Sequence, residues 1–150
     1  MTYRCVIADT SVVFTVPPTV AFDYLTDPDN RAEWQSSLRT INGLVRVGDH
    51  PGAVGTAWTD VTVVPGVNPR MEVVEYVAGQ RWTELGRWGP VDARLSLSFT
   101  ATPAGTRVGV LAHLTVPTLL APVPVVVRPI ASVALRGDLA NAARYLNGTN

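Results

Sequence analysis

The sequence has no lysine, since all twelve of its basic residues are arginine. Schiff-base catalysis and phosphate-binding loops of the Walker type depend on a lysine amine, so its absence excludes both. Twelve acidic residues balance the arginines. The resulting net charge of zero gives none of the attraction that phosphate backbones or anionic lipid head groups exert on a basic protein. Nucleic acid is therefore not an expected partner.

Cysteine is nearly absent, and the single Cys5 excludes an internal disulfide. The N-terminal residues MTYRCVIADTS carry no long apolar run after a basic start, so no signal peptide is expected and a cytoplasmic location is predicted. The most apolar tract, VPTLLAPVPVVVRPIASVAL, is interrupted by four prolines and Arg128. Stable membrane insertion is not expected for it, and we predict that it packs in the interior or in an interface.

Sequence motifs of the common enzyme classes are also missing. The sequence contains no GxSxG, HExxH, CxxC, phosphate-binding loop or dinucleotide fingerprint. Its two histidines, His50 in the GDHPG turn and His113 in a strand-like run, are far apart and offer no metal-ligand spacing. No metal and no cofactor are predicted.

The pattern of apolar residues predicts an α+β protein, and the length of 150 residues suits one domain covering 1–150. A strand up to Val16 is followed by two prolines and a short helix with Ala21, Phe22 and Leu25 on one face. The Asp27-Pro28 step ends that helix and begins a second. Turn sequences then separate six strands, at about 38–47, 55–64, 70–77, 81–88, 91–101 and 106–116. An amphipathic helix after Pro129 closes the chain near Gly148.

Residues opposite each other in an antiparallel pair share a face, so short hairpin turns predict which side chains line the sheet's concave face. Carrying this parity across the sheet places Glu75 and Glu84 together on the apolar face. Two carboxyl groups in such a site do not both ionise easily, and one of them should have a raised pKa. They are candidate proton donors, candidate anchors for a ligand, or structural groups bonded to water or to an arginine. The inward face of strand 55–64 stays open, with Trp58 and Asp60 as one alternative.

The chain resembles the START-related superfamily (SRPBCC), in particular its polyketide cyclase/dehydrase and lipid-transport branch. The resemblance rests on VPPTVAFDYLTDPDNRAEW, the glycine turn at Gly48 to Gly55, VVEYVAGQRW, FTATPAGTRV and the final RGDLANAARYL. It implies a helix-grip fold, in which a curved seven-stranded antiparallel sheet wraps around a long C-terminal helix, with two short helices between strands 1 and 2. The superfamily implies a cavity for hydrophobic molecules and no catalytic signature shared by all members.

Two functions follow from this resemblance and stay open on the sequence alone, and a third, a protein-partner adaptor, would be favoured by a cavity filled with side chains. One is a carrier or sensor of a small hydrophobic molecule such as a lipid or polyketide, held between the sheet and the C-terminal helix. The other is a cyclase or dehydratase-like enzyme that uses Glu75 or Glu84 as general acid or base. The residues predicted to contact the ligand are Trp34, Val73, Glu75, Trp82, Glu84, Trp88, Leu95, Leu97, Phe99, Val110 and Gly137.

Overall fold

The computed structural model describes residues 1–148, so the last two residues of the predicted domain lie outside the described part of the chain. The strands are β1 (Thr2–Phe14), β2 (Leu38–Val45), β3 (Ala57–Thr62), β4 (Arg70–Val77), β5 (Arg81–Trp88), β6 (Val91–Thr102) and β7 (Gly105–Pro117). The helices are α1 (Pro18–Leu25), a 3-10 turn (Pro28–Asn30), α2 (Arg31–Trp34), a second 3-10 turn (Thr118–Leu120) and α3 (Pro122–Asn147).

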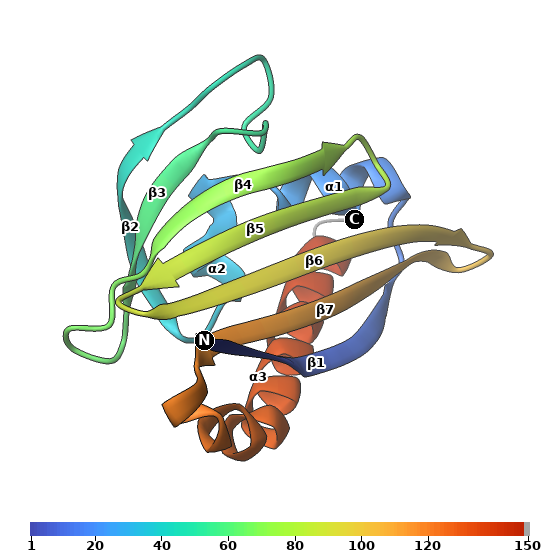
Figure 1. Ribbon diagram of the computed structural model, residues 1–150. Helices are drawn as coiled ribbons and strands as arrows, with labels where there is room; N and C mark the ends of the chain where they lie inside the picture. The colour runs from blue at the N-terminus through green and yellow to red at the C-terminus, as the bar shows by residue number, and fades with distance from the viewer. Residues whose placement is uncertain (149–150) are drawn as a thin grey trace.

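The strands form one antiparallel sheet in the order β1-β7-β6-β5-β4-β3-β2. The sheet is strongly curved, and all three helices lie on its concave side (Figure 1). This arrangement confirms the predicted helix-grip fold: seven antiparallel strands, two short helices between the first two strands, and a long C-terminal helix.

The elbow between α1 and α2 forms as the sequence predicted. Pro18 begins α1, whose buried face carries Ala21, Phe22 and Leu25. The Asp27 carboxylate then accepts a hydrogen bond from the Asp29 N–H at 3.0 Å, which caps the 3-10 turn that starts at Pro28. Helix α2 follows directly and lies on the concave side of the sheet (Figure 1).

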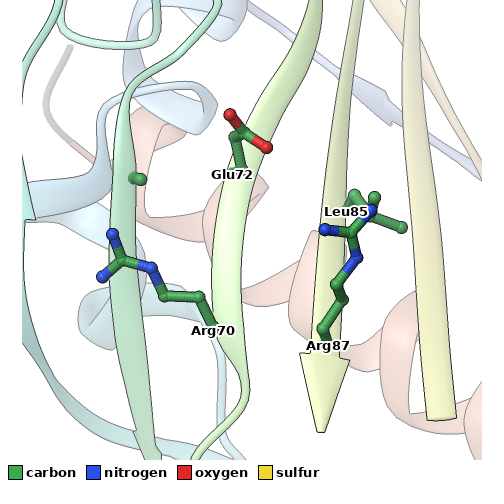
Figure 2. Close-up of a pocket in the computed structure, with 5 residues that line it drawn as sticks. Arg70, Glu72, Leu85 and Arg87 are labelled. Carbon is green, nitrogen blue, oxygen red and sulfur yellow. The ribbon is translucent and has the colours of Figure 1, made fainter. Parts of the chain in front are cut away.

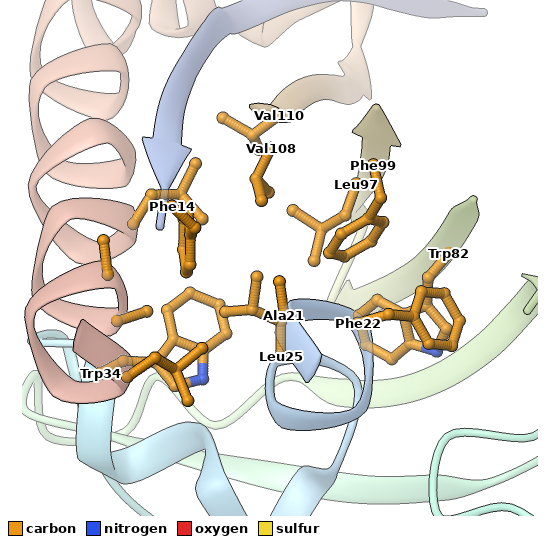
Figure 3. Close-up of a cluster of buried hydrophobic side chains, with 14 of the residues drawn as sticks. Phe14, Ala21, Phe22, Leu25, Trp34, Trp82, Leu97, Phe99, Val108 and Val110 are labelled. Carbon is orange, nitrogen blue, oxygen red and sulfur yellow. The ribbon is translucent and has the colours of Figure 1, made fainter. Parts of the chain in front are cut away.

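The core fills the space between the sheet and the helices. Figure 3 shows Trp34, Phe14 and Leu25 converging on one cluster with Leu97, Val108 and Val110 of the sheet. Leu139, Ala142 and Leu146 of α3 belong to the same cluster. The C-terminal half of α3 therefore packs directly on these side chains, and the pocket described below lies beside α2 instead of in the predicted place between the sheet and α3.

Strand β4 corrects the predicted parity of its second half. The three-residue turn pairs Val77 with Arg81, and the register shifts between Val73 and Glu75. This bulge leaves Val73 on the concave face but turns Glu75 to the convex face, and Tyr76 takes the inward position instead. The prediction that Glu75 lies beside Glu84 is wrong because a tight hairpin parity cannot anticipate an inserted residue.

Helix α3 begins at Pro122, eight residues before the predicted start at Ile130, and Pro129 lies inside it. A proline in a helix removes one backbone hydrogen bond but does not end the helix when the flanking turns are held from outside. Here Arg128 Nε donates to the Val6 carbonyl at 2.8 Å, and Ser132 Oγ donates to the Ile7 carbonyl at 3.2 Å. These bonds tie α3 to the bulge in the edge strand β1, where ladder pairing is interrupted. Among the helices within residues 1–148, none combines the length and the apolarity needed to cross a membrane.

Candidate functional site

A pocket of about 320 Å³ lies at the end of the sheet where α2 faces the inner surface of β3 to β6. The β3–β4 loop and the β5–β6 turn border it. Its wall is mainly apolar on the sheet side and polar on the α2 side. The lining residues are Arg31, Gln35, Ser37, Asp60, Thr62, Val67, Pro69, Met71, Glu84, Gly86, Trp88, Val91 and Ala93.

Arg31 is the first residue of α2 and reaches from the helix into the sheet, where only 2% of its surface stays exposed. Its Nη1 donates to Glu84 Oε2 at 2.6 Å. Its Nη2 and Nε donate to the two carboxylate oxygens of Asp60, at 2.9 and 3.3 Å. The guanidinium thus bridges β3 and β5 through two buried carboxylates, and the planar fork suits this paired geometry.

Trp58 holds the third side of this cluster. Its indole Nε1 donates to Asp60 Oδ1 at 2.8 Å, and its ring lies 4.8 Å from the Arg31 guanidinium carbon. The ring face is electron-rich and attracts the cation. Trp58 is fully buried, so the ring also shields the Arg31–Asp60 pair from water. The cluster of Arg31, Trp58, Asp60 and Glu84 is called the arginine cluster below.

The arginine cluster holds one cation and two carboxyl groups in a site with little water. Burial raises the pKa of Glu84, Arg31 opposes that rise, and the Asp60 charge adds to it, so the net direction is upward from 4.5. Burial alone would lower the pKa of Arg31, but Glu84 and Asp60 raise it overall, and the guanidinium stays charged. The pKa of the Glu84 carboxyl group in the pocket wall is therefore higher than that of a solvated glutamate.

The residues predicted to contact a ligand separate into three groups. Glu84 and Trp88 line the pocket, and Trp88 lies half exposed at its edge with Nε1 donating to the Gly66 carbonyl at 3.2 Å. Most of the others are core residues of the cluster around α1: Trp34, Val73, Trp82, Leu97, Phe99 and Val110, with Leu95 packed against them. Two predicted residues lie elsewhere, namely Glu75 and Gly137.

Glu75 accepts a hydrogen bond from Thr83 Oγ1 at 2.9 Å and pairs with Arg81 Nε at 3.0 Å on the convex face of the sheet. Gly137 is exposed on α3, and a Cβ built there would meet nothing within 4 Å. Neither residue lines the pocket. Glu75 lies on the convex face because of the β4 bulge. Gly137 is exposed because it lies on the side of α3 that faces away from the core.

Arg31 was not predicted as a site residue, although the sequence carried a signal for it. Pro28, Arg31 and Trp34 are spaced three residues apart, which places them on one side of a helical turn, and all three are buried. An arginine on the same side as a buried tryptophan needs a buried acid as its partner. Asp60 was one of the alternatives for the inward face of strand 55–64, and the structure places it and Trp58 inward.

A hollow of about 220 Å³ on the convex face has a different character (Figure 2). Arg70 and Arg87 lie opposite each other in the β4–β5 register, and Glu72 and Leu85 form the pair two positions further along, on the same face. These side chains are solvated, and the hollow contains no buried charge. His50 stacks on Tyr76 with ring centres 5.2 Å apart, and His113 lies in β7 opposite Arg94, so the two histidines stay apart.

The curved sheet, the long C-terminal helix and the pocket at the open end of the sheet define a protein of the helix-grip class. The chain belongs to the polyketide cyclase / dehydrase and lipid transport family, whose sequence profile matches residues 6–147. This match confirms the resemblance drawn from the sequence. The comparison with curated proteins found no match.

Solved structures with the same fold include proteins of different kinds. The di-domain ARO/CYC StfQ of the steffimycin biosynthetic pathway is similar with a TM-score of 0.76 and 14% identity over 99% of this chain and 51% of that chain. Ara h 8.0201 has a TM-score of 0.73 and 14% identity, with 99% of both chains covered. Protein MLL2253 from Mesorhizobium loti has a TM-score of 0.71 and 15% identity over 100% of this chain and 99% of that chain. Identities this low establish a shared fold.

Proposed function

We propose that the protein binds a small hydrophobic molecule in the pocket beside α2, as a carrier or sensor, and that the arginine cluster orients that molecule. The observation that carries this proposal is a set of buried charges at the wall of a pocket whose exposed lining is mainly apolar. Its volume of about 320 Å³ suits a small ligand, and such sites combine apolar walls with a few fixed polar groups. The family of hydrophobic-ligand proteins to which the chain belongs supports the same conclusion.

The cluster favours a ligand that donates hydrogen bonds. Two carboxylates offer about eight acceptor positions, and the donors that reach them belong mainly to Arg31 and Trp58. Hydrogen-bond acceptors are thus in excess over donors. An anionic group on the ligand would be repelled by the two carboxylates. We therefore propose a neutral, hydroxyl-bearing ligand, such as a phenolic polyketide or a lipid alcohol, whose hydroxyl group bonds to Glu84.

Native mass spectrometry of freshly purified protein, followed by extraction of any retained molecule, tests this proposal. Ala93 lies at the pocket mouth on β6, so Ala93→Phe should fill the pocket and remove the bound mass. Ala101→Phe, at an exposed position of the same strand outside the pocket, is the matched control and should retain it. Equal ligand retention by the two variants would refute binding in this pocket.

A second function, that of a cyclase or dehydratase-like enzyme, is favoured by one specific feature: the raised pKa of Glu84 at the pocket wall. A protonated carboxyl group there can donate a proton to a carbonyl or hydroxyl oxygen of a folded chain and recover it from the adjacent carbon. We propose Glu84 as the acid–base group of this alternative and Arg31 as the residue that positions it. Glu75 is not included because its carboxylate lies on the convex face.

One variant, Glu84→Gln, distinguishes the carrier or sensor from the enzyme. Glu84→Gln keeps the size of the side chain and a hydrogen-bonding oxygen but removes proton transfer. If the protein is a cyclase or dehydratase-like enzyme, the wild type should turn over a poly-β-ketone thioester probe. Glu84→Gln should lose this turnover but should still bind the probe. Binding of the probe without turnover by either protein would support the carrier or sensor.

A further inference from the structure

The N-terminal half of α3 and the turn before it carry an exposed line of apolar side chains, called the α3 stripe below. Its members are Leu119, Val123, Val126, Ile130 and Val133. Leu119 is 95% exposed, Ile130 68% and Val133 75%. Figure 1 shows this part of α3, in orange, beyond the β1 edge of the sheet. The stripe thus lies on the side of the helix that the sheet does not cover.

The spacing of the α3 stripe is that of a helix made to pack on another helix. Its residues alternate steps of four and three, and the series continues through Gly137 and Ala140. Apolar residues at this 3.5-residue period form one seam along a helix, which the seam of a second helix can cover. At Gly137 a Cβ would meet nothing within 4 Å, so the small residues leave room for a second helix to come close.

The opposite side of α3 contacts the core and strand β1. Leu139, Ala142 and Leu146 pack in the core, and Arg128 and Ser132 donate to the β1 carbonyls. The α3 stripe has no such partner in the described part of the chain, where its side chains stay exposed. It leaves on the order of 600 Å² of apolar surface in water, at the top of the range for the largest patch on a monomer. That area approaches the roughly 800 Å² that each partner contributes to a standard interface.

The chemistry of the stripe favours a protein helix over a lipid surface. Helices that lie on membranes combine aromatic residues with a strongly basic polar face. The stripe contains no aromatic residue, and the chain has no net charge. Arg128, the basic residue nearest its centre, is held by the Val6 carbonyl. No acidic residue is exposed on α3 within the described residues, since Asp138 is buried and accepts from Ser36, so two copies of the helix meet without carboxylate repulsion.

We propose that the α3 stripe is a self-association surface, on which α3 of a second copy of this chain packs across a two-fold axis. The same residues then face one another from both copies, as in other isologous dimers. Val126, Ile130 and Val133 form the centre of the contact, and Gly137 and Ala140 the end where the helix backbones approach most closely. The pockets beside α2 lie outside this interface, so both remain accessible in the dimer.

Sedimentation velocity of the purified chain between about 1 and 100 µM tests this proposal, because that range covers the affinities expected of a modest interface. The wild type should sediment as a dimer at the upper end. Val133→Glu and Ile130→Glu should each raise the dissociation constant at least about 30-fold, as central interface substitutions do. Val20→Glu changes an exposed valine of another helix and should leave the dimer unchanged. Circular dichroism shows that each variant is folded.

Three results would overturn the proposal. A wild type that stays monomeric throughout the concentration range has no such interface. A dimer that persists in both glutamate variants uses another surface. A monomeric chain that binds phosphatidylglycerol vesicles, and loses that binding in Val133→Glu, assigns the α3 stripe to a lipid surface instead.

Discussion

Arg31 donates to Glu84 across 2.6 Å, although the two residues are 53 positions apart in the sequence and almost fully buried. The bond joins the short helix α2 to the middle strand of the sheet. With Asp60 as second acceptor, it places a fixed set of charges in the wall of a pocket that is otherwise lined mainly by apolar surface.

Replacing Arg31 by methionine should lower the free energy of unfolding by about 3–5 kcal/mol, since it leaves two buried carboxyl groups without their cation. Urea unfolding at neutral pH measures the change. Arg46→Met is the matched control, because Arg46 also pairs with aspartates, Asp27 and Asp29, but at the surface. Its loss should stay below about 1 kcal/mol. Similar losses for both variants would show that the buried position of Arg31 has no special role.

The pH dependence of stability should reveal Glu84. Its pKa is raised in the folded protein, mainly by burial, so between 4.5 and that raised value the folded state binds a proton that the unfolded state has released. The contribution of Glu84 is therefore fully present below pH 4.5 and is lost as pH rises through the folded pKa. The wild type should lose stability relative to Glu84→Gln by at most about 1.4 kcal/mol per pH unit in that window.

Urea unfolding of wild type and Glu84→Gln at a series of pH values above 4.5 measures this difference. Glu72→Gln, on the convex face of β4, is the control and should run parallel to the wild type. A stability difference between wild type and Glu84→Gln that stays constant, or changes in the opposite direction, would contradict the assigned pKa shift.

Much of the fold followed from local sequence features. Pro18, Asp27 and Pro28 specify the α1–α2 elbow because caps and prolines act on their own neighbours. The β5–β6 and β6–β7 hairpins keep one register throughout, so parity carried from their turns places Glu84, Leu97 and Val110 on the inner face. These features needed no knowledge of distant contacts.

The misplaced features depend on tertiary structure. The β4 bulge places Glu75 on the convex face. Bulges bend a strand, so their positions depend on the curvature of the whole sheet. Helix α3 runs through Pro129 because Arg128 and Ser132 bond to β1, more than 120 positions away. The burial of Arg31 was not predicted, because its partners Asp60 and Glu84 lie on two strands distant in the sequence. A single basic residue in a polar stretch is usually solvated.

Two glycines should respond oppositely to alanine. At Gly52 a Cβ would lie 2.5 Å from the Thr26 carbonyl oxygen and 3.1 Å from Trp82 Nε1, which bonds to the Gly52 carbonyl. Gly52→Ala should therefore destabilise the protein by about 1–3 kcal/mol, since this backbone cannot move away without losing that bond. Gly137→Ala should stabilise it by about 0.5–1 kcal/mol, because the position is helical and open.

Thermal or urea unfolding compares the two, with both substitutions made in the Val133→Glu background so that self-association does not contribute. Gly66→Ala, in the β3–β4 loop, is a further comparison: its Cβ meets nothing, but its φ of 82° disfavours any side chain. A Gly52→Ala protein as stable as its parent would show that the loop before β3 is not held against Thr26 and Trp82.

Trp58 and Trp34 offer a test of the arginine cluster itself, since both are buried but only one indole is bonded. Trp58 Nε1 donates to Asp60 at 2.8 Å, whereas Trp34 Nε1 has no hydrogen-bond partner within residues 1–148. Phenylalanine at either position removes similar apolar surface. Trp58→Phe also breaks a hydrogen bond to a charged group, and should cost about 1–2 kcal/mol more of the free energy of unfolding than Trp34→Phe.

A double-mutant cycle of Trp58→Phe with Asp60→Asn should return a coupling energy of about 1 kcal/mol or more, whereas Trp34→Phe with Asp60→Asn should be additive. Equal losses for the two phenylalanine variants, or additivity in both cycles, would show that Trp58 contributes packing alone to the cluster that orients Glu84.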